Sequence, residues 1–302
     1  MNTAQKKSGN IAGLCAALDY SRQAFYQHRT TIEREALQEE LIIQEVLRIR
    51  LRQKRVGTTR LLEMMQAFLL AHKIQKGRDK LNDLLSVHNL LIRSRKRKAP
   101  RTTFSGHWLK KHPNLIVGMP VIHPNTLWVS DITYITLKED FAYLSLITDA
   151  YSRMIVGYHL SKNLQAEGCV AALKMALKQL PVAHGLIHHS DRGSQYCSTE
   201  YVEQLQGNHI AISMTQNSDP RENAIAERVN GIIKLEFLET SYINFNKAKQ
   251  EVTNAIYIYN HERLHSSIDM LTPFQAHKMT GKLKKHWKNY YLLNKEKEAA
   301  MA

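Results

Sequence analysis

Three acidic residues, Asp131, Asp191 and Glu227, could do the most distinctive chemistry in this chain. Between the first two lie 59 residues, and between the last two lie 35. Asp131 lies in an apolar, β-branched run, Asp191 opens a turn after a short apolar run, and Glu227 lies in a helical stretch. A carboxylate in a buried strand is costly unless it is paired or binds a metal. Carboxylates that converge from two strands and a helix therefore predict a hard-cation site of the Mg²⁺ or Mn²⁺ type.

The chemistry that such a site suits is cleavage and transfer of a phosphodiester. Two divalent ions about 3.5–4 Å apart can stabilise the leaving oxygen and help the attacking oxygen to lose its proton. Any one of the acids alone is commonly a salt-bridge partner or a helix cap, but the three in fitting contexts favour catalysis. We expect Asp131, Asp191 and Glu227 to hold two Mg²⁺ ions per site, with Mn²⁺ as a substitute.

The helical stretch around Glu227 offers further polar groups on the same side. Asn223, Glu227, Asn230 and Lys234 are spaced by three or four residues, so they share one face of a helix. We expect Lys234 to hold a phosphate near the metal ions, although an isolated lysine is more often an ordinary surface residue. Asn223, Asn230 and Arg192, which lies in the turn beside the second acid, are further candidates for DNA contact.

Two histidines, His188 and His189, precede Asp191 and make a zinc site conceivable. In an extended run their rings point to opposite faces, and no Cys or His cluster matches them. The sequence therefore favours oxygen ligands and a hard cation over zinc.

The charge of the chain favours a polyanionic partner. Lys and Arg number 42 against 27 Asp and Glu, which gives a net charge of +15, and the sequence pI is about 9.7. Nucleic acid is the first candidate and an anionic membrane the second. No apolar run approaches the roughly 20 residues of a membrane span, so we expect no membrane partner. Three dispersed cysteines indicate a reducing cytosol and no disulfide framework.

The N-terminal part of the chain is rich in predicted helices. A short helix over 11–18, a break, and a second helix over 22–28 capped by Ser21 form a helix-turn-helix pattern. An ordinary helical hairpin fits this segment equally well. We expect Arg22 to contact DNA, and a long helix over 31–55 to be a connector or an oligomerisation helix.

A second helical pair and a basic linker follow. Helices are predicted over 58–72 and 77–89, with Arg78 as a candidate phosphate contact. Residues 91–111 carry eight cations and no acid, and Arg95 and Arg97 are the DNA-contact candidates there. Charge runs are commonly solvated tails, but this one joins a helical module to a β-rich module.

From residue 120 the pattern becomes α/β and predicts a five-stranded mixed sheet with flanking helices. Strands are expected over 127–136, 142–149, 153–160, 185–190 and 210–214. Helices are expected over 166–180, 199–206, 222–240 and 246–260. The predicted domains are 1–55 (helix-turn-helix and connector helix), 56–92 (second helix-turn-helix-like module), 93–119 (basic linker), 120–280 (catalytic core) and 281–302 (basic tail).

Three strings carry a resemblance to a known family. They are Trp-Val-Ser-Asp-Ile-Thr-Tyr at 128–134, His-Ser-Asp-Arg-Gly-Ser-Gln-Tyr at 189–196 and Asn-Ala-Ile-Ala-Glu-Arg at 223–228. Together with Lys234, seven residues after the last acid, they resemble bacterial insertion-sequence transposases of the DDE class, within the retroviral-integrase superfamily. More narrowly, the chain is similar to the downstream-frame (OrfB) transposase of insertion sequence three.

The resemblance implies an α/β ribonuclease-H-like catalytic core preceded by all-α helix-turn-helix modules. It implies that Asp131, Asp191 and Glu227 are metal ligands for Mg²⁺-dependent DNA cleavage at the element's ends and for strand transfer by a 3′-hydroxyl. Its expected partners are the terminal inverted repeats, target DNA, further copies of the chain and the upstream-frame protein. The expected location is the bacterial cytoplasm, associated with the nucleoid.

Two other functions fit parts of the sequence. A DNA-binding regulator without catalysis would share the helical modules, but all three acids are retained. A ribonuclease-H-type nuclease would share the acids, but it does not need the helix-turn-helix modules or the basic linker. The sequence favours a transposase over both.

Overall fold

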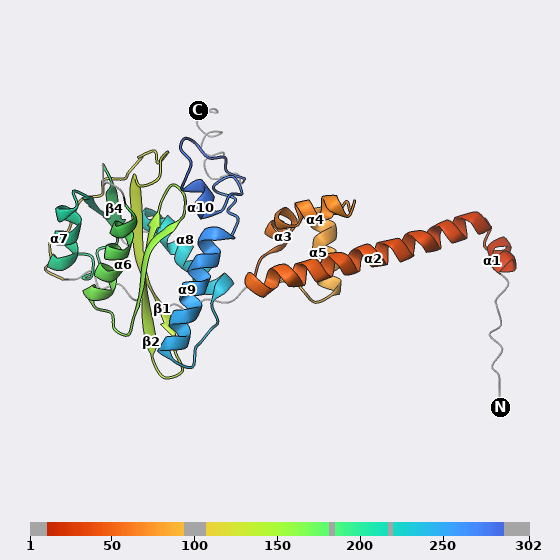
Figure 1. The fold of residues 1–302 in the computed structure, drawn as a ribbon, viewed down its shortest axis with the longest axis horizontal. Coiled ribbons are helices and arrows are strands. Elements are labelled where there is room, and N and C mark those ends of the chain that lie inside the picture. Colours follow the sequence, from red (N-terminus) through yellow and green to blue (C-terminus); the bar gives the residue numbers. More distant parts are fainter. Residues whose placement is uncertain (1–10, 94–106, 181–184, 217–219, 287–302) are drawn as a thin grey trace, which may run out of the picture. The chain divides into compact units, whose positions relative to one another are not determined.

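The computed structural model describes residues 11–93, 107–180, 185–216 and 220–286 (Figure 1). Their contacts divide the chain into two compact units. The first, the helical unit, comprises residues up to 52 together with 56–92. The second, the sheet unit, comprises 53–55 and the residues from 93 onward. Within the described ranges, none of the helices combines the length and apolar character that a bilayer span requires.

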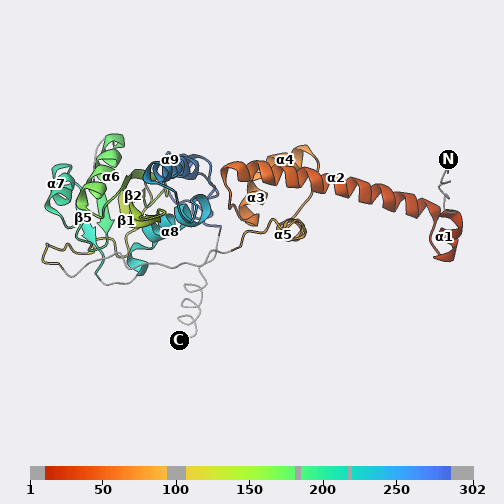
Figure 2. The ribbon, with the colours of Figure 1, turned by 90° about the horizontal axis from the view of Figure 1, so that it is seen from below.

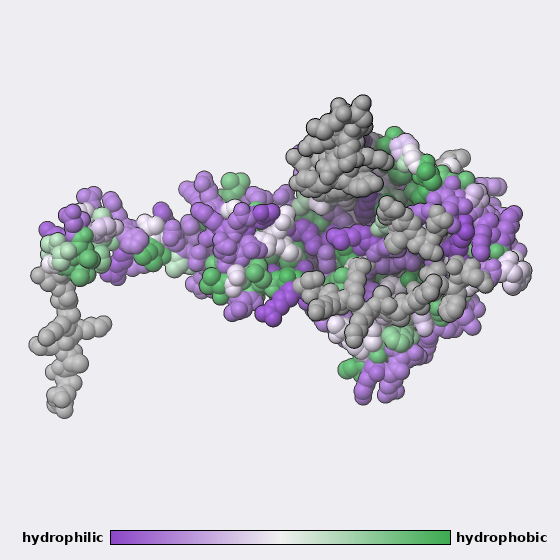
Figure 3. All heavy atoms as spheres, turned by 180° about the vertical axis from the view of Figure 1, so that it is seen from behind, coloured by the Kyte–Doolittle hydropathy of each residue, from purple (hydrophilic) through white to green (hydrophobic). Residues whose placement is uncertain are grey.

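The helical unit has one long helix and four short ones. They are α1 (Ile11–Ala17), α2 (Arg22–Arg52), α3 (Thr58–Met64), α4 (Gln66–Ala71) and α5 (Arg78–Val87). The second half of α2 packs against α3–α5 through a core that includes Ile42, Val46, Leu61 and Leu85. On the face that Figure 3 draws, hydrophilic side chains cover most of this unit.

The N-terminal helices differ from the sequence prediction at one point. Ser21 caps α2 as expected, since its Oγ accepts from the Ala24 N–H at 3.1 Å. However, the break predicted near residue 30 is absent, and α2 runs without interruption for 31 residues. Thr30 and Thr31 donate their hydroxyl protons to carbonyl oxygens four residues back, at 3.0 and 2.9 Å. Their side chains are thus satisfied inside the helix and do not compete with it as caps.

The sheet unit contains the predicted five-stranded mixed sheet (Figures 1 and 2). The strands are β1 (Leu127–Thr136), β2 (Phe141–Asp149), β3 (Ile155–Ser161), β4 (Ile187–Ser190) and β5 (Ala211–Met214). The strand order is β3-β2-β1-β4-β5. β1 and β3 both pair antiparallel to β2, whereas β4 pairs parallel to both β1 and β5. β1 is therefore the central strand, between the antiparallel and the parallel part.

Helices cover both faces of this sheet. One apolar cluster joins α6 (Ala166–Gln179) and α7 (Thr199–Gly207) to Trp128 and Ile147. A second cluster joins α8 (Ala224–Ile232) and α9 (Phe245–His261) to Leu144 and Leu146. Because successive residues of a strand point to opposite faces, Ile147 and Leu146 mark the two sides. The sheet thus forms the middle layer of three.

The helix predicted over 222–240 is interrupted. It consists of the 3₁₀ turn η1 (Pro220–Asn223), α8, and the π-helical turn η2 (Ile233–Phe237). The Leu238 N–H bonds the Ile233 carbonyl, five residues back, at 3.1 Å. Single π-helical turns are frequent at functional sites, and this one contains Lys234. A short helix, α10 (Pro273–Ala276), ends the described secondary structure.

A test of the packing of α6 on β3 is Gly157→Ala. The added Cβ would overlap the carbonyl oxygen of Ala172 and lie 2.9 Å from the Cβ of Ala176. We expect the free energy of unfolding of the sheet unit to fall by roughly 1–3 kcal/mol, as measured by urea denaturation. Gly207→Ala is the control, because a Cβ at that helical position meets nothing within 4 Å. A loss of stability as large in the control would contradict this account.

Candidate active site

The pairing of β1 with β4 brings two of the acids together. Trp128 pairs with His188 and Val129 with His189 in a parallel register. Two further residues along each strand lead to Asp131 and Asp191, which therefore follow the same register. Since side chains alternate across a strand, Asp131 points to the same face as Val129, which packs against Ala226 of α8.

Helix α8 is held to this same part of β1 by two asparagines. The Asn230 side-chain NH₂ donates to Asp131 Oδ2 at 2.8 Å. The Asn223 side-chain NH₂ donates to the Ser130 carbonyl at 2.9 Å. Glu227 lies between them in the sequence, three residues before Asn230 and therefore on the same face of the helix. The helix thus brings the third acid to the side of the sheet that carries the first two.

Electrostatics show that the three acids act on one another. Burial, together with the charges of Asp191 and Glu227, raises the pKa of Asp131 to about 7, although hydrogen bonds from Asn230 and the Ile132 N–H oppose the rise. The Ile132 N–H donates to Asp131 Oδ1 at 2.9 Å. Asp131 is thus a desolvated carboxyl group beside two other negative charges.

The arrangement fits a hard cation in its chemistry, but it is not a closed cage. Among the residues that the structure describes, no three Asp, Glu, His or Cys side chains are grouped closely enough to hold a metal ion. The donors that converge are all carboxylate oxygens, the ligands that Mg²⁺ prefers. Their mutual repulsion at Asp131 is a charge imbalance that a divalent cation would relieve.

Comparison with known proteins agrees with this geometry. The integrase core domain family matches residues 122–220 and 208–273. The "Insertion element IS600 uncharacterized 31 kDa protein" of Shigella sonnei is 35% identical over 270 residues, which cover 86% of this chain and 96% of that protein. The "Transposase for insertion sequence element IS629" of Shigella sonnei is 30% identical and covers 70% of this chain and 71% of its own. "Transposase InsF for insertion sequence IS3A" of Escherichia coli (strain K12) is 32% identical over 59% of this chain and 63% of its own.

The chain belongs to the insertion-sequence transposases of the IS3 family. It is therefore a DNA transposase, with the integrase core of a polynucleotidyl transferase. The resemblance read from the three sequence strings is confirmed, as is the ribonuclease-H-like fold class. Integrase cores are metal-dependent enzymes.

The opposite face of β1 in this transposase carries a buried hydrogen-bond network. His188 Nε2 lies 2.7 Å from Ser130 Oγ and 2.8 Å from the Tyr201 hydroxyl. Burial lowers the pKa of His188 to about 3, with a further effect from the neighbouring His189. The imidazole is therefore neutral, and it links β4 to the residue that precedes Asp131 and to α7.

His189 points to the other face, as predicted, and its Nδ1 lies 2.8 Å from Ser213 Oγ on β5. The two rings therefore have separate hydrogen-bond partners on different elements. Within the described part of the chain neither belongs to a group of metal-ligating side chains, so the zinc interpretation gains no support.

The turn after β4 is fixed from two sides. The Gly193 N–H donates to Asp191 Oδ1 at 3.0 Å, which folds the turn back on the acid. His107 Nε2 donates to the Arg192 carbonyl at 2.8 Å. The side chain of Arg192 is partly exposed. Its Nε is buried, and the DNA contact that the sequence predicts for Arg192 stays a prediction.

The two asparagines predicted to contact DNA, Asn223 and Asn230, are buried against the sheet. Asn223 is 6% exposed and Asn230 is 5% exposed, and their NH₂ groups are used by Ser130 and Asp131. The helix face that carries them is turned onto the sheet, so their DNA contact stays a prediction that the described contacts do not support. Their partners indicate that they position the strand and the first acid.

The remaining predicted DNA-contact residues include Lys234, Arg22, Arg95 and Arg97. The Lys234 ammonium lies 3.5 Å from the centroid of the Tyr134 ring, a cation–π contact. Arg22 is exposed on α2, and Arg95 and Arg97 lie outside the described residues. The structure thus leaves their DNA contacts as predictions.

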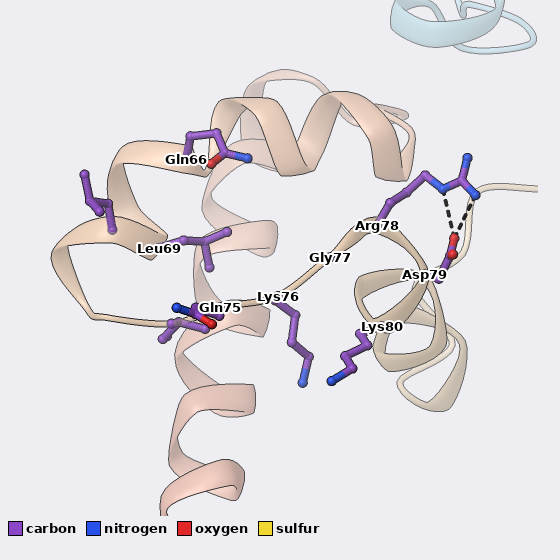
Figure 4. Close-up of a pocket in the computed structure, with 10 residues that line it drawn as sticks. Gln66, Leu69, Gln75, Lys76, Gly77, Arg78, Asp79 and Lys80 are labelled. Carbon is purple, nitrogen blue, oxygen red and sulfur yellow. Dashed lines mark hydrogen bonds and ion pairs between the residues drawn. The ribbon is translucent and has the colours of Figure 1, made fainter.

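Arg78 is exposed at the start of α5 (Figure 4). Its guanidinium pairs with Asp79 at 2.8 Å. The pocket around this helix start is also lined by Lys76 and Lys80, and Lys76 pairs with Glu39 of α2 at 3.1 Å. Acidic partners thus compete with DNA for two of these cations, so a phosphate contact by Arg78 remains a prediction.

Several site residues were not found from the sequence. Ser130 stands beside Asp131, but nothing in the sequence distinguishes it as a partner of His188, 58 residues away. Tyr201 and His107 carry no local pattern, because each acts through a contact that only folding creates. Ser130, Tyr201 and His107 are supporting residues of the candidate site.

Removal of the Asp131 charge should stabilise the protein and abolish its response to Mg²⁺. Asp131→Asn keeps acceptor and donor groups near Asn230 but removes a desolvated charge beside two carboxylates. We expect a higher thermal unfolding midpoint than wild type in EDTA, and a rise on addition of Mg²⁺ in the wild type alone. Differential scanning fluorimetry measures both. The exposed Glu203→Gln variant should behave as wild type; a stabilisation by Mg²⁺ that survives in Asp131→Asn would contradict the assignment.

The neutral state of His188 predicts a pH dependence of stability. Its folded pKa, about 3, lies below the roughly 6.5 of an unfolded histidine. Below that pH the unfolded chain binds a proton that the folded chain does not, so stability is lost as the pH falls, by up to about 1.4 kcal/mol per pH unit. In His188→Gln this loss should be smaller. Urea unfolding at about pH 7 and about pH 5 measures it, and equal losses in both proteins would refute the role.

Proposed function

We propose that this transposase cuts DNA at the ends of its element and joins the freed 3′-hydroxyl to target DNA, with Asp131, Asp191 and Glu227 as the catalytic carboxylates. The observation that carries the proposal is the convergence at Asp131. The register of β1 and β4 and the hydrogen bond from α8 bring two further carboxylates to it, and both raise its pKa. A buried structural acid would instead be paired with a cation.

The three carboxylates are suited to hold two Mg²⁺ ions, with Mn²⁺ as a substitute. When bound, these ions would supply stabilisation of the leaving oxygen and activation of the attacking hydroxyl. Asp131 is the rigid member, since its two oxygens are already oriented by the Ile132 N–H and Asn230. Asp191 lies in a turn and Glu227 lies in the first turn of α8. Small movements of these segments would bring the two carboxylates to the ions.

The neighbouring polar residues have distinct roles in this proposal. Asn230 fixes the orientation of the Asp131 carboxylate, and Asn223 fixes the strand beside it. Lys234 and Arg192 bind phosphates of the DNA strand at the site. The Lys234 ammonium lies on the ring of Tyr134, and it would have to leave this cation–π contact to bind a phosphate.

The rest of the chain supplies DNA binding. The excess of positive charge, +15 over the whole chain, suits the phosphate backbone. We propose that the helical unit binds the terminal inverted repeats, with Arg22 and Arg78 among its phosphate contacts, and that several copies assemble on DNA in the bacterial cytoplasm. The basic linker with Arg95 and Arg97 and the upstream-frame protein would add to this binding.

Purified protein with Mg²⁺ and labelled DNA ends of the element tests the proposal against its alternatives. Joined products support transposition. Cut products without joining support a nuclease of the ribonuclease H type, and binding without any product supports a regulator.

The catalytic assignment predicts equal effects at three positions. Asp131→Asn, Asp191→Asn and Glu227→Gln should each reduce cleavage and joining by at least about 100-fold, because each removes an oxygen ligand of the metal site. DNA binding, measured by a gel-shift assay, should remain near the wild-type level. Glu203→Gln, at an exposed position of α7, is the matched control and should stay active. Strong residual activity in any of the three would remove that residue from the site.

A further inference from the structure

We propose that Trp108 is a base-stacking residue, which packs its indole ring on the unpaired DNA base that flanks the phosphodiester in the active site. This inference rests on the proposed function, since it assumes DNA beside Asp191. Trp108 is 92% exposed. Tryptophan is highly buried on average in proteins, so its almost complete exposure next to a catalytic turn calls for a partner.

The residues on either side of Trp108 are fixed to the sheet unit. His107 donates to the carbonyl of Arg192, the residue after Asp191, at 2.8 Å. Leu109 packs against the apolar cluster that contains Trp128. Trp108 stands between these two contacts, so its backbone is held while its side chain faces solvent. Trp108 directly follows His107, which contacts the residue after Asp191. The exposed ring is therefore close to the turn that carries the second acid.

The segment that follows is anchored as well. The Met214 N–H donates to the Pro113 carbonyl at 3.2 Å, and the Leu115 N–H donates to Ser213 Oγ at 2.9 Å. The segment from His107 to Leu115 thus runs from the Asp191 turn along β5. Ser213 is also the partner of His189. A ring carried on such a segment needs little ordering when DNA binds, which lowers the entropic cost of stacking.

The charges around Trp108 suit a nucleic acid. Lys110 and Lys111 follow it and are exposed. Burial raises the pKa of the Cys197 thiol, and so does the charge of Asp191, whereas Lys111 and Arg192 lower it. All three charged groups are therefore close enough to act on one thiol, which places two cations beside the second acid. Exposed cations next to an exposed aromatic ring are the combination by which proteins bind single-stranded nucleic acid.

An unpaired base fits this ring better than a base inside a duplex. In a duplex both faces of a base are covered by its neighbours, so a side chain stacks only where the strand is unpaired or ends. Enzymes that act within DNA take such bases from the stack and hold them against aromatic groups. A cut end provides one, because the terminal base has a free face. The exposed cations Lys110 and Lys111 close behind Trp108 favour a nucleic acid over an apolar protein surface.

Binding of a fluorescein-labelled, single-stranded oligothymidylate in EDTA tests the ring without any chemistry. Trp108→Ala in the full chain should weaken binding by about 5- to 100-fold, the range for loss of one base–aromatic stack, and Trp108→Phe should restore most of it. Tyr257→Ala is the matched control, because Tyr257 is an exposed aromatic residue of the same unit, on α9. Binding by Trp108→Ala within about twofold of wild type would overturn the proposal.

Joining assays locate the base. Pre-cut element ends that lack a single base, one position at a time, should show one position whose loss reduces joining by wild type as much as Trp108→Ala does. At that position the variant and the abasic site should not add. Additive losses at every position would overturn the role at the active site. If wild type joins no ends but the Trp108-dependent binding persists, the proposed function fails and the stacking surface stands.

Discussion

The cost of burying the Asp131 carboxylate is the constraint on which the rest of the sheet unit depends. A desolvated charge needs compensation, and neighbouring groups give it only in part. Asn230 and the Ile132 N–H donate to its two oxygens, while Asp191 and Glu227 add further negative charge. A structural acid would not be placed beside two others. The folded state is therefore held against this repulsion by the surrounding packing.

The two faces of β1 make different contacts. On one face α8 supplies Asn223, Asn230 and the third acid. On the other face a neutral His188 bonds Ser130 and Tyr201, so that β1, β4 and α7 are linked by one buried ring. The apolar layers beneath α6 and α9 surround both arrangements. The polar contacts set the positions of the acids, and the apolar layers supply the stability that permits a strained charge distribution.

The segment that leads into the sheet unit has a role beyond connection. From His107 onward it contacts the Asp191 turn, the core and β5 in succession. In the helical unit, the second half of the unbroken α2 contributes to the apolar core with α3–α5. Its first half begins with the exposed Arg22.

The sequence by itself determined the chemistry and the fold class. The three acids in their strand, turn and helix contexts, the alternation of β1, and the apolar runs of the other strands are local signals, and local geometry follows from them. It was less reliable near residue 30, where two separate helices were predicted but α2 continues, with the hydroxyls of Thr30 and Thr31 bonded back within the helix.

Only the tertiary structure decided which groups support the acids. The helical spacing of Asn223 and Asn230 showed that they share a face with Glu227, but not that this face lies on the sheet. Ser130 and His188 meet, and His107 reaches Arg192, across 58 and 85 residues of sequence. Such contacts depend on the order of strands and on which helix face is buried. These are collective properties of packing, and no single segment of the chain encodes them.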